Sequence, residues 1–284
     1  EVHEDELEHG RYARMNSQQY KFVKLMFALA MLAAETALSI VLFNGLTDSD
    51  NPVLPVLFAI GMILLSIAWA ADAPFAARWV WGIGSGAHLG FTLYAMSSWI
   101  HHTHYDIKHV NPAWFIPVVG NVLVPLAGVG FGNVGMSVFS FSVGIIMWLG
   151  ILPVVLLRLF THKAMPPKFR PTVLILVAPP AVGSVAALSL FGDLDDPSLA
   201  GAALLSTAGA FLLLALTMLP EIIALPFNIP HWAMSFPLAA MAAATLLYSN
   251  VFGIFFLAIA SLLIAWLWGK TVNAIVRGGI FVEE

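Results

Sequence analysis

Residues 231–250, HWAMSFPLAAMAAATLLYSN, decide the fold, because they place a proline inside a run that is apolar enough to cross a membrane. Pro237 has no N–H to donate to the carbonyl of Ala233, and its ring displaces that carbonyl, so we predict a kink. In lipid, freed backbone groups are tolerated mainly where they face protein or a water-filled cavity. Phe236 precedes this proline among small residues. The stretch therefore predicts a buried or pore-facing helix with one large ring at its bend.

The composition of the whole chain indicates a polytopic membrane protein. Of its 284 residues, 60% are hydrophobic and only 10% are charged, and the mean hydropathy is +0.89. A transmembrane helix needs about 20 mostly apolar residues, whereas a β-barrel needs short alternating segments. Nine runs meet the helical requirement: 20–44, 52–71, 76–100, 112–130, 134–160, 171–191, 198–222, 231–249 and 251–278. We predict an all-α membrane protein in a lipid bilayer.

The remaining polar sequence narrows the possibilities. Residues 1–19 carry too little apolar surface to insert, so they are expected to form a polar N-terminal tail or loop before a single transmembrane domain, 20–280. The small negative net charge of −4 argues against a nucleic-acid partner. The absence of cysteine excludes disulfides and thiolate metal sites. Glu35 lies near the centre of run 20–44. An intramembrane carboxylate is either functional or a protonated group hydrogen-bonded to another helix.

Prolines recur with a regular period. They lie inside or at the first turn of runs 52–71, 112–130, 171–191 and 231–249, and the intervening runs nearly lack them. Taking one proline from each of these four runs, Pro55, Pro117, Pro179 and Pro237 follow one another at intervals of 62, 62 and 58 residues. This period indicates a repeated helical hairpin. Because irregular backbone at membrane depth belongs beside a cavity, we predict a ring with the kinked helices inside and the straight ones outside.

The period and the charges both suggest a tenth span. Stepping the repeat back from Pro55 places a further kinked helix upstream of Glu1, with run 20–44 as its outer partner. Lysines and arginines gather in loop 161–170 and near the C-terminus, whereas acidic residues occupy loop 192–197. The positive-inside rule then predicts a cytoplasmic C-terminus. An even number of spans would bring the basic N-terminal segment to the same side, and we prefer ten spans over eight with run 20–44 not crossing.

Three proline-containing segments carry a family resemblance. They are NPAWFIPVVGNVLVPLAG (111–128), PPKFRPTVLILVAPPAVG (166–183) and HWAMSFPLAA (231–240). From residue 51 to residue 280 the chain resembles the tellurite-resistance/C4-dicarboxylate transporter family, which includes bacterial TehA and the plant slow-type anion channels. The resemblance implies ten helices as five hairpins around a central pore. It also implies a homotrimer with one pore per subunit, placement in the bacterial inner membrane, and conduction of small inorganic anions.

The resemblance also assigns roles to individual residues. Phe236 matches the phenylalanine that occludes the pore of family members, with ordinary core packing as the alternative. The prolines that match kinks of inner helices, Pro55 less securely than the others, are Pro55, Pro117, Pro179, Pro180 and Pro237. Their alternative role is helix bending without contact to any ion. Gly120 and Gly183 are candidates for lining the pore, although small residues in membranes more commonly allow helices to pack closely.

A histidine cluster supports a rival hypothesis from another class. Several imidazoles at short spacing can bind a metal, which would suit a membrane metalloenzyme. The cluster follows run 76–100 beside amphipathic aromatic residues and consists of His101, His102, His104 and His109. Such residues commonly mark the membrane interface. We therefore expect an interfacial loop, no metal or other cofactor, and no enzymatic activity.

The kinked runs lack ionisable residues, and this separates two kinds of transport. No Asp, Glu, Lys or Arg occurs in 52–71, 112–130, 171–191 or 232–248. A proton-coupled carrier for malate and other C4-dicarboxylates usually places an ionisable relay in the substrate path. The sequence thus favours a passive channel for chloride, nitrate and similar anions, closed by Phe236. A C4-dicarboxylate carrier or a tellurite-resistance transporter is the alternative within the same family.

Overall fold

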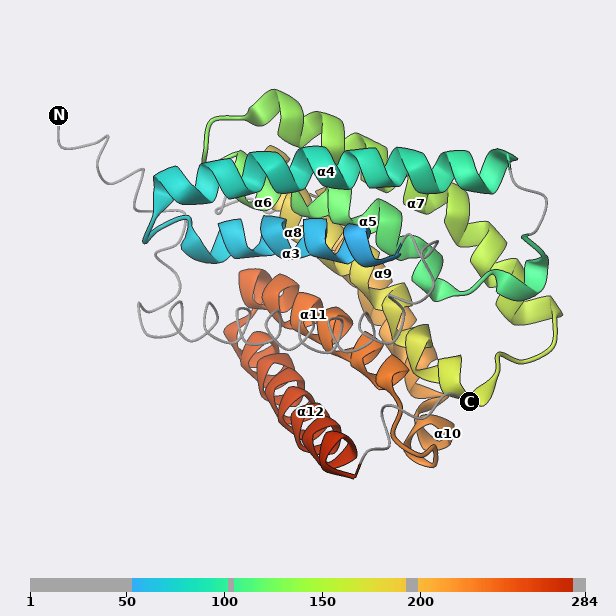
Figure 1. Cartoon of the computed structure of the whole chain (residues 1–284). Coiled ribbons are helices and arrows are strands. Elements are labelled where there is room, and N and C mark those ends of the chain that lie inside the picture. The colour runs from blue at the N-terminus through green and yellow to red at the C-terminus, as the bar shows by residue number, and fades with distance from the viewer. Residues whose placement is uncertain (1–52, 102–104, 193–198, 278–284) are drawn as a thin grey trace, which may run out of the picture.

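The regular elements of the protein are all helices in the described part of the chain. The computed structural model describes residues 53–101, 105–192 and 199–277 (Figure 1). Within these ranges no strand occurs, which confirms the predicted all-α class. The N-terminal tail, run 20–44 with Glu35, and the acidic loop 193–196 lie outside the described residues.

The helices follow the predicted spans closely. The α-helices are α3 (Val53–Trp69), α4 (Pro74–His101), α5 (Ile116–Leu123), α6 (Pro125–Gly128), α7 (Val134–Thr161), α8 (Ala178–Phe191), α9 (Leu199–Leu216), α10 (Leu219–Ile223), α11 (Ser235–Tyr248) and α12 (Asn250–Val276). The 3₁₀ segments are η1 (Ile107–His109), η2 (Pro112–Phe115), η3 (Pro167–Val177) and η4 (Ile229–Met234). Each predicted run from 52 onward therefore corresponds to one helix or to two or three successive helical segments.

Burial divides the spans into two kinds, as the proline pattern predicts. In the most apolar 18-residue window of η3 and α8 (Pro167–Phe191), 78% of residues are buried, against 28%, 22% and 22% in α7, α9 and α12. The straight helices carry large apolar side chains on their exposed faces, among them Ile146, Leu213 and Leu262. Such faces suit contact with lipid. The expectation of broken helices inside and straight helices outside is confirmed for these spans.

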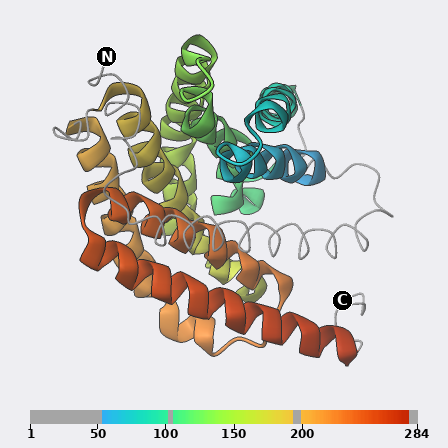
Figure 2. The same cartoon turned by 90° about the vertical axis from the view of Figure 1, so that its left-hand side faces the viewer.

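The helices pair as hairpins that follow one another along an arc. Each inner helix makes its main contact with the straight helix that comes after it: α3 with α4, α5 with α7, α8 with α9, and α11 with α12. The inner helices contact one another in the order α3, α5, α8 and α11. Figure 2 shows these hairpins following one another along an arc from α3 to α12. The predicted hairpin repeat is thus present in the described part of the chain.

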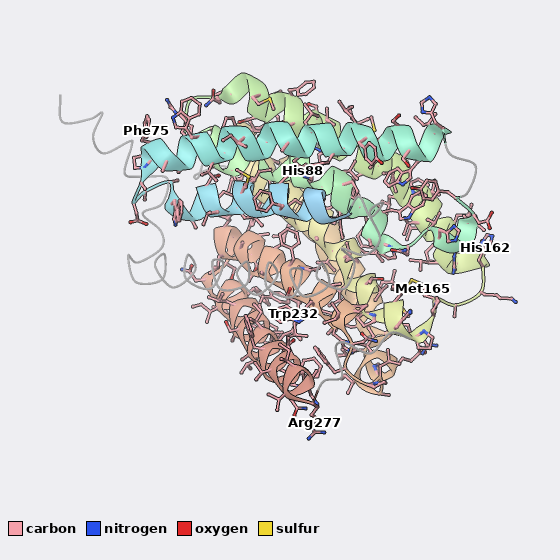
Figure 3. All side chains as sticks on the ribbon, viewed as in Figure 1. Phe75, His88, His162, Met165, Trp232 and Arg277 are labelled. Atoms are coloured by element: carbon pink, nitrogen blue, oxygen red, sulfur yellow. The ribbon has the colours of Figure 1, made fainter. Side chains whose placement is uncertain are left out.

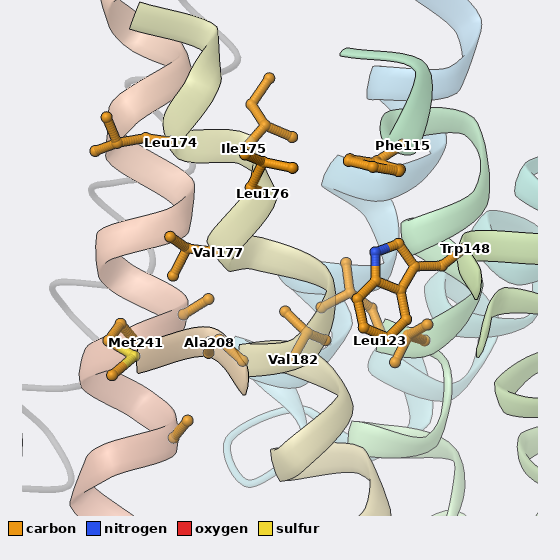
Figure 4. Packing of buried hydrophobic residues seen from close by; sticks show 14 of the residues in the cluster. Phe115, Leu123, Trp148, Leu174, Ile175, Leu176, Val177, Val182, Ala208 and Met241 are labelled. Carbon is orange, nitrogen blue, oxygen red and sulfur yellow. The ribbon is translucent and has the colours of Figure 1, made fainter. Parts of the chain in front are cut away.

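The core lies between the inner and outer helices rather than in one central layer. Figure 4 shows Trp148 of α7 beside Leu123 of α5 and Val182 of α8, with Met241 of α11 beyond. All four side chains belong to one continuous buried cluster. Packing of this kind drives helix association in membranes, where burial from water is already complete. The core thereby fixes the inner helices against the outer ones.

One end of the molecule collects the 3₁₀ segments and most of the described basic residues. Because successive spans are antiparallel, η2, η3 and η4 all lie at the end where α7 and α12 finish, and η3 contacts both η2 and η4. We call it the basic end, after its arginines and lysines: Arg158, Lys163, Lys168, Arg170, Lys270 and Arg277. Figure 3 shows His162, Met165 and Arg277 on the side away from Phe75, which begins α4 at the opposite end. The two ends therefore differ in charge.

Candidate functional site

Over residues 235–245, helix α11 is buried except along one narrow face. Four residues at helical spacing are partly exposed, whereas most of their neighbours are buried: Ala233 at the end of η4, then Phe236, Ala239 and Ala243. Intervals of three, three and four residues place them on one side of the helix. We call this set the α11 stripe. Three of its members are alanines, so Phe236 is its one large side chain.

Phe236 is held firmly although its ring is not fully covered. It packs against the main buried cluster, and Ser235 and Pro237 on either side of it are buried. The Ser235 hydroxyl donates to the carbonyl of Trp232, 2.7 Å away. The backbone that carries the ring is therefore fixed by local hydrogen bonding and by packing, while Phe236 itself stays partly exposed.

The prolines mark changes of helix type rather than bends within one continuous α-helix. Pro117, Pro179 and Pro237 all lie in the first turn of an α-helix that directly follows a 3₁₀ segment, and Pro180 follows Pro179. A proline fits the first turn because the N–H it lacks would have no partner within the helix. The bend predicted at each proline is thus a junction between 3₁₀ and α-helix. Pro55 lies in the first turn of α3.

Outer-helix side chains bind the interrupted backbone of the inner helices. The hydroxyl of Thr92 on α4 lies 2.5 Å from the carbonyl oxygen of Pro117 and accepts a hydrogen bond from the Asn121 side chain, 2.7 Å away. The indole N–H of Trp81, also on α4, donates to the carbonyl of Val124 at 2.9 Å, where α5 gives way to α6. In a membrane, freed carbonyls need such partners from neighbouring helices. Sequence reasoning missed these braces, because no local pattern marks them.

Gly120 and Gly183 both face side chains of other helices in this structure. A methyl group on Gly120 would lie 2.3 Å from the imidazole of His88 and 2.8 Å from Ile60. A methyl group on Gly183 would meet Ile145 and Leu204 at 3.3 Å. The geometry therefore favours close helix packing at these positions, with the more severe constraint at Gly120.

We predict that Gly120→Ala destabilises the fold by about 1–3 kcal/mol, because the added methyl must displace a fully buried ring. Gly86→Ala is the matched control, since Gly86 lies on the exposed face of the neighbouring helix α4 with no atom within 4 Å of the added methyl. That change should be neutral or slightly stabilising, because alanine favours the helix over glycine. Heating followed by size-exclusion chromatography would compare both variants with the parent. Equal stability of the two variants would contradict the packing role of Gly120.

The described histidines near the end of α4 make local contacts. His101 Nδ1 lies 2.8 Å from the carbonyl oxygen of Ser97, and His109 Nδ1 accepts from the backbone N–H of Asp106 at 3.1 Å. His102 and His104 lie outside the described residues. Among the residues that the structure describes, no three His, Asp or Glu side chains lie close enough together to hold a metal ion. The metal hypothesis therefore gains no support from this part of the chain.

Aromatic rings join the same loop to the start of an inner helix. Trp99 of α4 stacks on Trp114 of η2 with ring centroids 4.5 Å apart, and Tyr105 meets Trp114 edge-on at 5.9 Å. Amphipathic rings of this kind gather at membrane–water boundaries. Their contact fixes η2 against α4 at the basic end.

The chain belongs to a family of membrane anion channels. Residues 18–275 match the SLAC1 family, described as voltage-dependent anion channels. This confirms the family suspected from the proline-containing segments, and the family consists of channels and transporters rather than enzymes. A chain of these properties is an integral membrane protein that transports anions.

Individual relatives come from archaea, bacteria and plants. An uncharacterized transporter of Methanocaldococcus jannaschii is 26% identical over 279 residues, covering 85% of this chain and 80% of that protein. A tellurite resistance protein TehA homolog of Haemophilus influenzae is 30% identical over 215 residues, covering 72% of this chain and 63% of that protein. The S-type anion channel SLAH2 of Arabidopsis thaliana is 29% identical over 144 residues, which is 50% of this chain and 27% of the plant protein.

Proposed function

We propose that this protein is a channel that conducts small monovalent anions, such as chloride and nitrate, along the α11 stripe, and that Phe236 closes it. The observation that carries this proposal is the stripe itself. Over residues 235–245 an otherwise buried inner helix leaves one face partly exposed, and the stripe on that face consists of alanines and one phenylalanine. A narrow apolar constriction blocks ions sterically and by dewetting, so a single ring among small residues is sufficient as a gate.

Anion preference needs a source other than fixed cations in the path. The inner helices carry no Asp, Glu, Lys or Arg within the described spans. Their N-terminal ends all lie at the basic end, and the partial positive charge of a helix N-terminus favours anions there. Attraction from dipoles is weak compared with that of a bound cation. The channel should therefore select mainly by the cost of removing water from each anion.

The orientation and assembly of the channel complete the proposal. The excess of Lys and Arg at the basic end supports its placement on the cytoplasmic side, together with the C-terminal end of α12. The resemblance to family members supports a homotrimer with one pore per subunit in the bacterial inner membrane. A C4-dicarboxylate carrier or a tellurite-resistance transporter is the alternative to a channel. The Haemophilus influenzae relative is named as a tellurite resistance protein TehA homolog.

We expect permeability in the order iodide and nitrate, then chloride, with divalent malate and sulfate lowest. Weak binding groups cannot compensate for the full dehydration of a strongly hydrated anion, and the dehydration penalty rises steeply with charge. Reversal potentials under bi-ionic conditions, recorded from protein in planar bilayers, give this order directly. The order should change little between about pH 5.5 and 8, because none of the four residues of the α11 stripe titrates in that range.

Two results would contradict this proposal in different ways. If malate permeates better than chloride, or if the order depends strongly on pH, the proton-coupled carrier is the better description. If tellurite uptake into vesicles saturates while no anion current flows, the resistance transporter is favoured. Vesicles without protein serve as the control for leak.

A further inference from the structure

The segment that leads into the helix of Phe236 is attached to α12 through Trp232. The indole N–H of Trp232 donates to the hydroxyl of Thr271, 3.0 Å away. Both residues are buried, Trp232 at 8% and Thr271 at 1% exposure. The Trp232 ring also meets Trp268 edge-on, with 5.8 Å between the ring centroids. A hydrogen bond between buried groups is costly to lose, because no water replaces the missing partner. Trp232 therefore fixes η4 against this outer helix.

The main chain of Trp232 is bonded in turn to the residue that precedes Phe236. Its carbonyl accepts from the backbone N–H of Ser235 and from the hydroxyl of the same residue, the latter at 2.7 Å. Ser235 is the first residue of α11 and is itself buried. The attachment to α12 thus reaches the backbone of Phe236 through a single residue.

The packing of the segment changes at the same point. Trp232 forms a small buried cluster with Ile264 and Leu267 of α12. Met234, two residues later, belongs to the main buried cluster, and Phe236 packs against that cluster. The change falls at the end of η4, just before the junction between 3₁₀ and α-helix. Packed interfaces tend to adopt discrete arrangements rather than deform continuously. The orientation of α11 therefore depends on where α12 holds Trp232.

We propose that Trp232 is a positioning residue for the gate: its hydrogen bond to Thr271 sets the rotation of α11 at which the Phe236 ring closes the channel. This inference rests on the proposed function, which takes Phe236 as the side chain that occludes the path. The bond is made in the closed arrangement, and its loss shifts the population toward arrangements in which the ring lies aside. Trp232 itself does not touch the anion, because its effect passes through the backbone at Ser235.

Removing the acceptor of this hydrogen bond tests the proposal. Thr271→Val keeps the shape of the side chain but leaves the buried indole N–H unpaired, so anion current per reconstituted protein should rise by about threefold or more over the parent. Thr271→Ser keeps a hydroxyl and should restore the parent current. The matched control is Thr245→Val, since Thr245 is a buried residue of α11 whose hydroxyl bonds to carbonyls of its own helix. An equal rise in both valine variants overturns the positioning role.

A double-mutant cycle separates positioning from structural support. In a Phe236→Ala background there is no ring to position, so Thr271→Val should change the current by less than about twofold. A residue that only supports the fold changes the amount of active protein, and hence the current, by the same factor in both backgrounds. That result would overturn the proposal. Should Thr271→Val fail to fold, Trp232→Phe keeps a ring without the N–H and should give the same pattern.

Cysteine labelling tests the position of α11 without any current. The chain contains no cysteine, so Ala239→Cys places a single thiol on the α11 stripe. A charged, membrane-impermeant thiol reagent is added at the basic end of oriented vesicles. Thr271→Val should raise the rate of modification by about threefold or more, whereas Thr245→Val should leave it unchanged.

The two readouts distinguish failure of this inference from failure of the proposed function. If Phe236→Ala does not raise the current but Thr271→Val still speeds labelling, Phe236 is not the gate and the control of α11 by Trp232 stands. If Phe236→Ala raises the current but Thr271→Val changes neither current nor labelling, the gate stands and the positioning role of Trp232 is overturned.

Discussion

Replacing Phe236 with alanine should raise anion current by about tenfold or more over the parent protein, because it removes the one large side chain of the α11 stripe and allows water to enter an apolar constriction. The neighbouring residues Ala233, Ala239 and Ala243 are too small to fill the space. Voltage-clamp recording from oocytes or planar bilayers measures the effect.

The matched control is Phe256→Ala on α12. Phe256 is also a partly buried ring that packs against the main cluster, but it lies on an outer helix. Its loss should reduce stability without opening the channel. The gate assignment fails if Phe236→Ala reaches the membrane in folded form and its current stays at the parent level, or if both alanine variants conduct alike.

Introducing a carboxylate one turn beyond Phe236 should abolish the current of the open variant. In the Phe236→Ala background, Ala239→Glu places a fixed negative charge on the α11 stripe, where a narrow path has low dielectric and repulsion of anions is strong. We expect anion current to fall by at least about tenfold, and any residual current to shift toward cations. Recording near pH 8 keeps the carboxylate ionised.

Two further variants separate charge from size at the same position. Ala239→Gln has nearly the same volume as Ala239→Glu and should retain most of the current, whereas Ala239→Lys should retain it and strengthen anion selectivity. Equal currents in the glutamate and glutamine variants would mean that the stripe does not line the path. In that case Phe236 would face lipid or another subunit, and a different inner face would have to conduct.

Much of the fold could be predicted from local sequence. Apolar runs and recurring prolines depend on residues close together in the chain, so they located the spans and separated inner from outer helices. The form of the proline interruptions could not be predicted in the same way. Whether Pro237 bends one helix or begins a second depends on which groups donate hydrogen bonds to the carbonyls before it. One such donor is the hydroxyl of Ser235, which binds the carbonyl of Trp232.

Features that depend on contacts between distant segments could not be predicted from the sequence. From the sequence, Gly120 is a candidate for lining the pore. The structure shows instead that it packs against His88 of α4. Arg158 reads as one of several basic residues near a loop, and only the packing of α7 on the inner helices reveals that it is buried. The role of Phe236 as a gate could be proposed from the sequence because the family resemblance supplied it. The α11 stripe around Phe236 could be recognised only from the structure.

The braces from α4 to α5 have a consequence for how the channel can diversify. Thr92 and Trp81 supply hydrogen bonds to the interrupted backbone, and Asn121 is the polar side chain of α5 that joins this network. If the proposed conduction path is correct, inner-helix residues outside this network can change in size, and homologues can acquire new anion preferences there without losing the fold. The constraint falls instead on the residues of α4 that supply these hydrogen bonds.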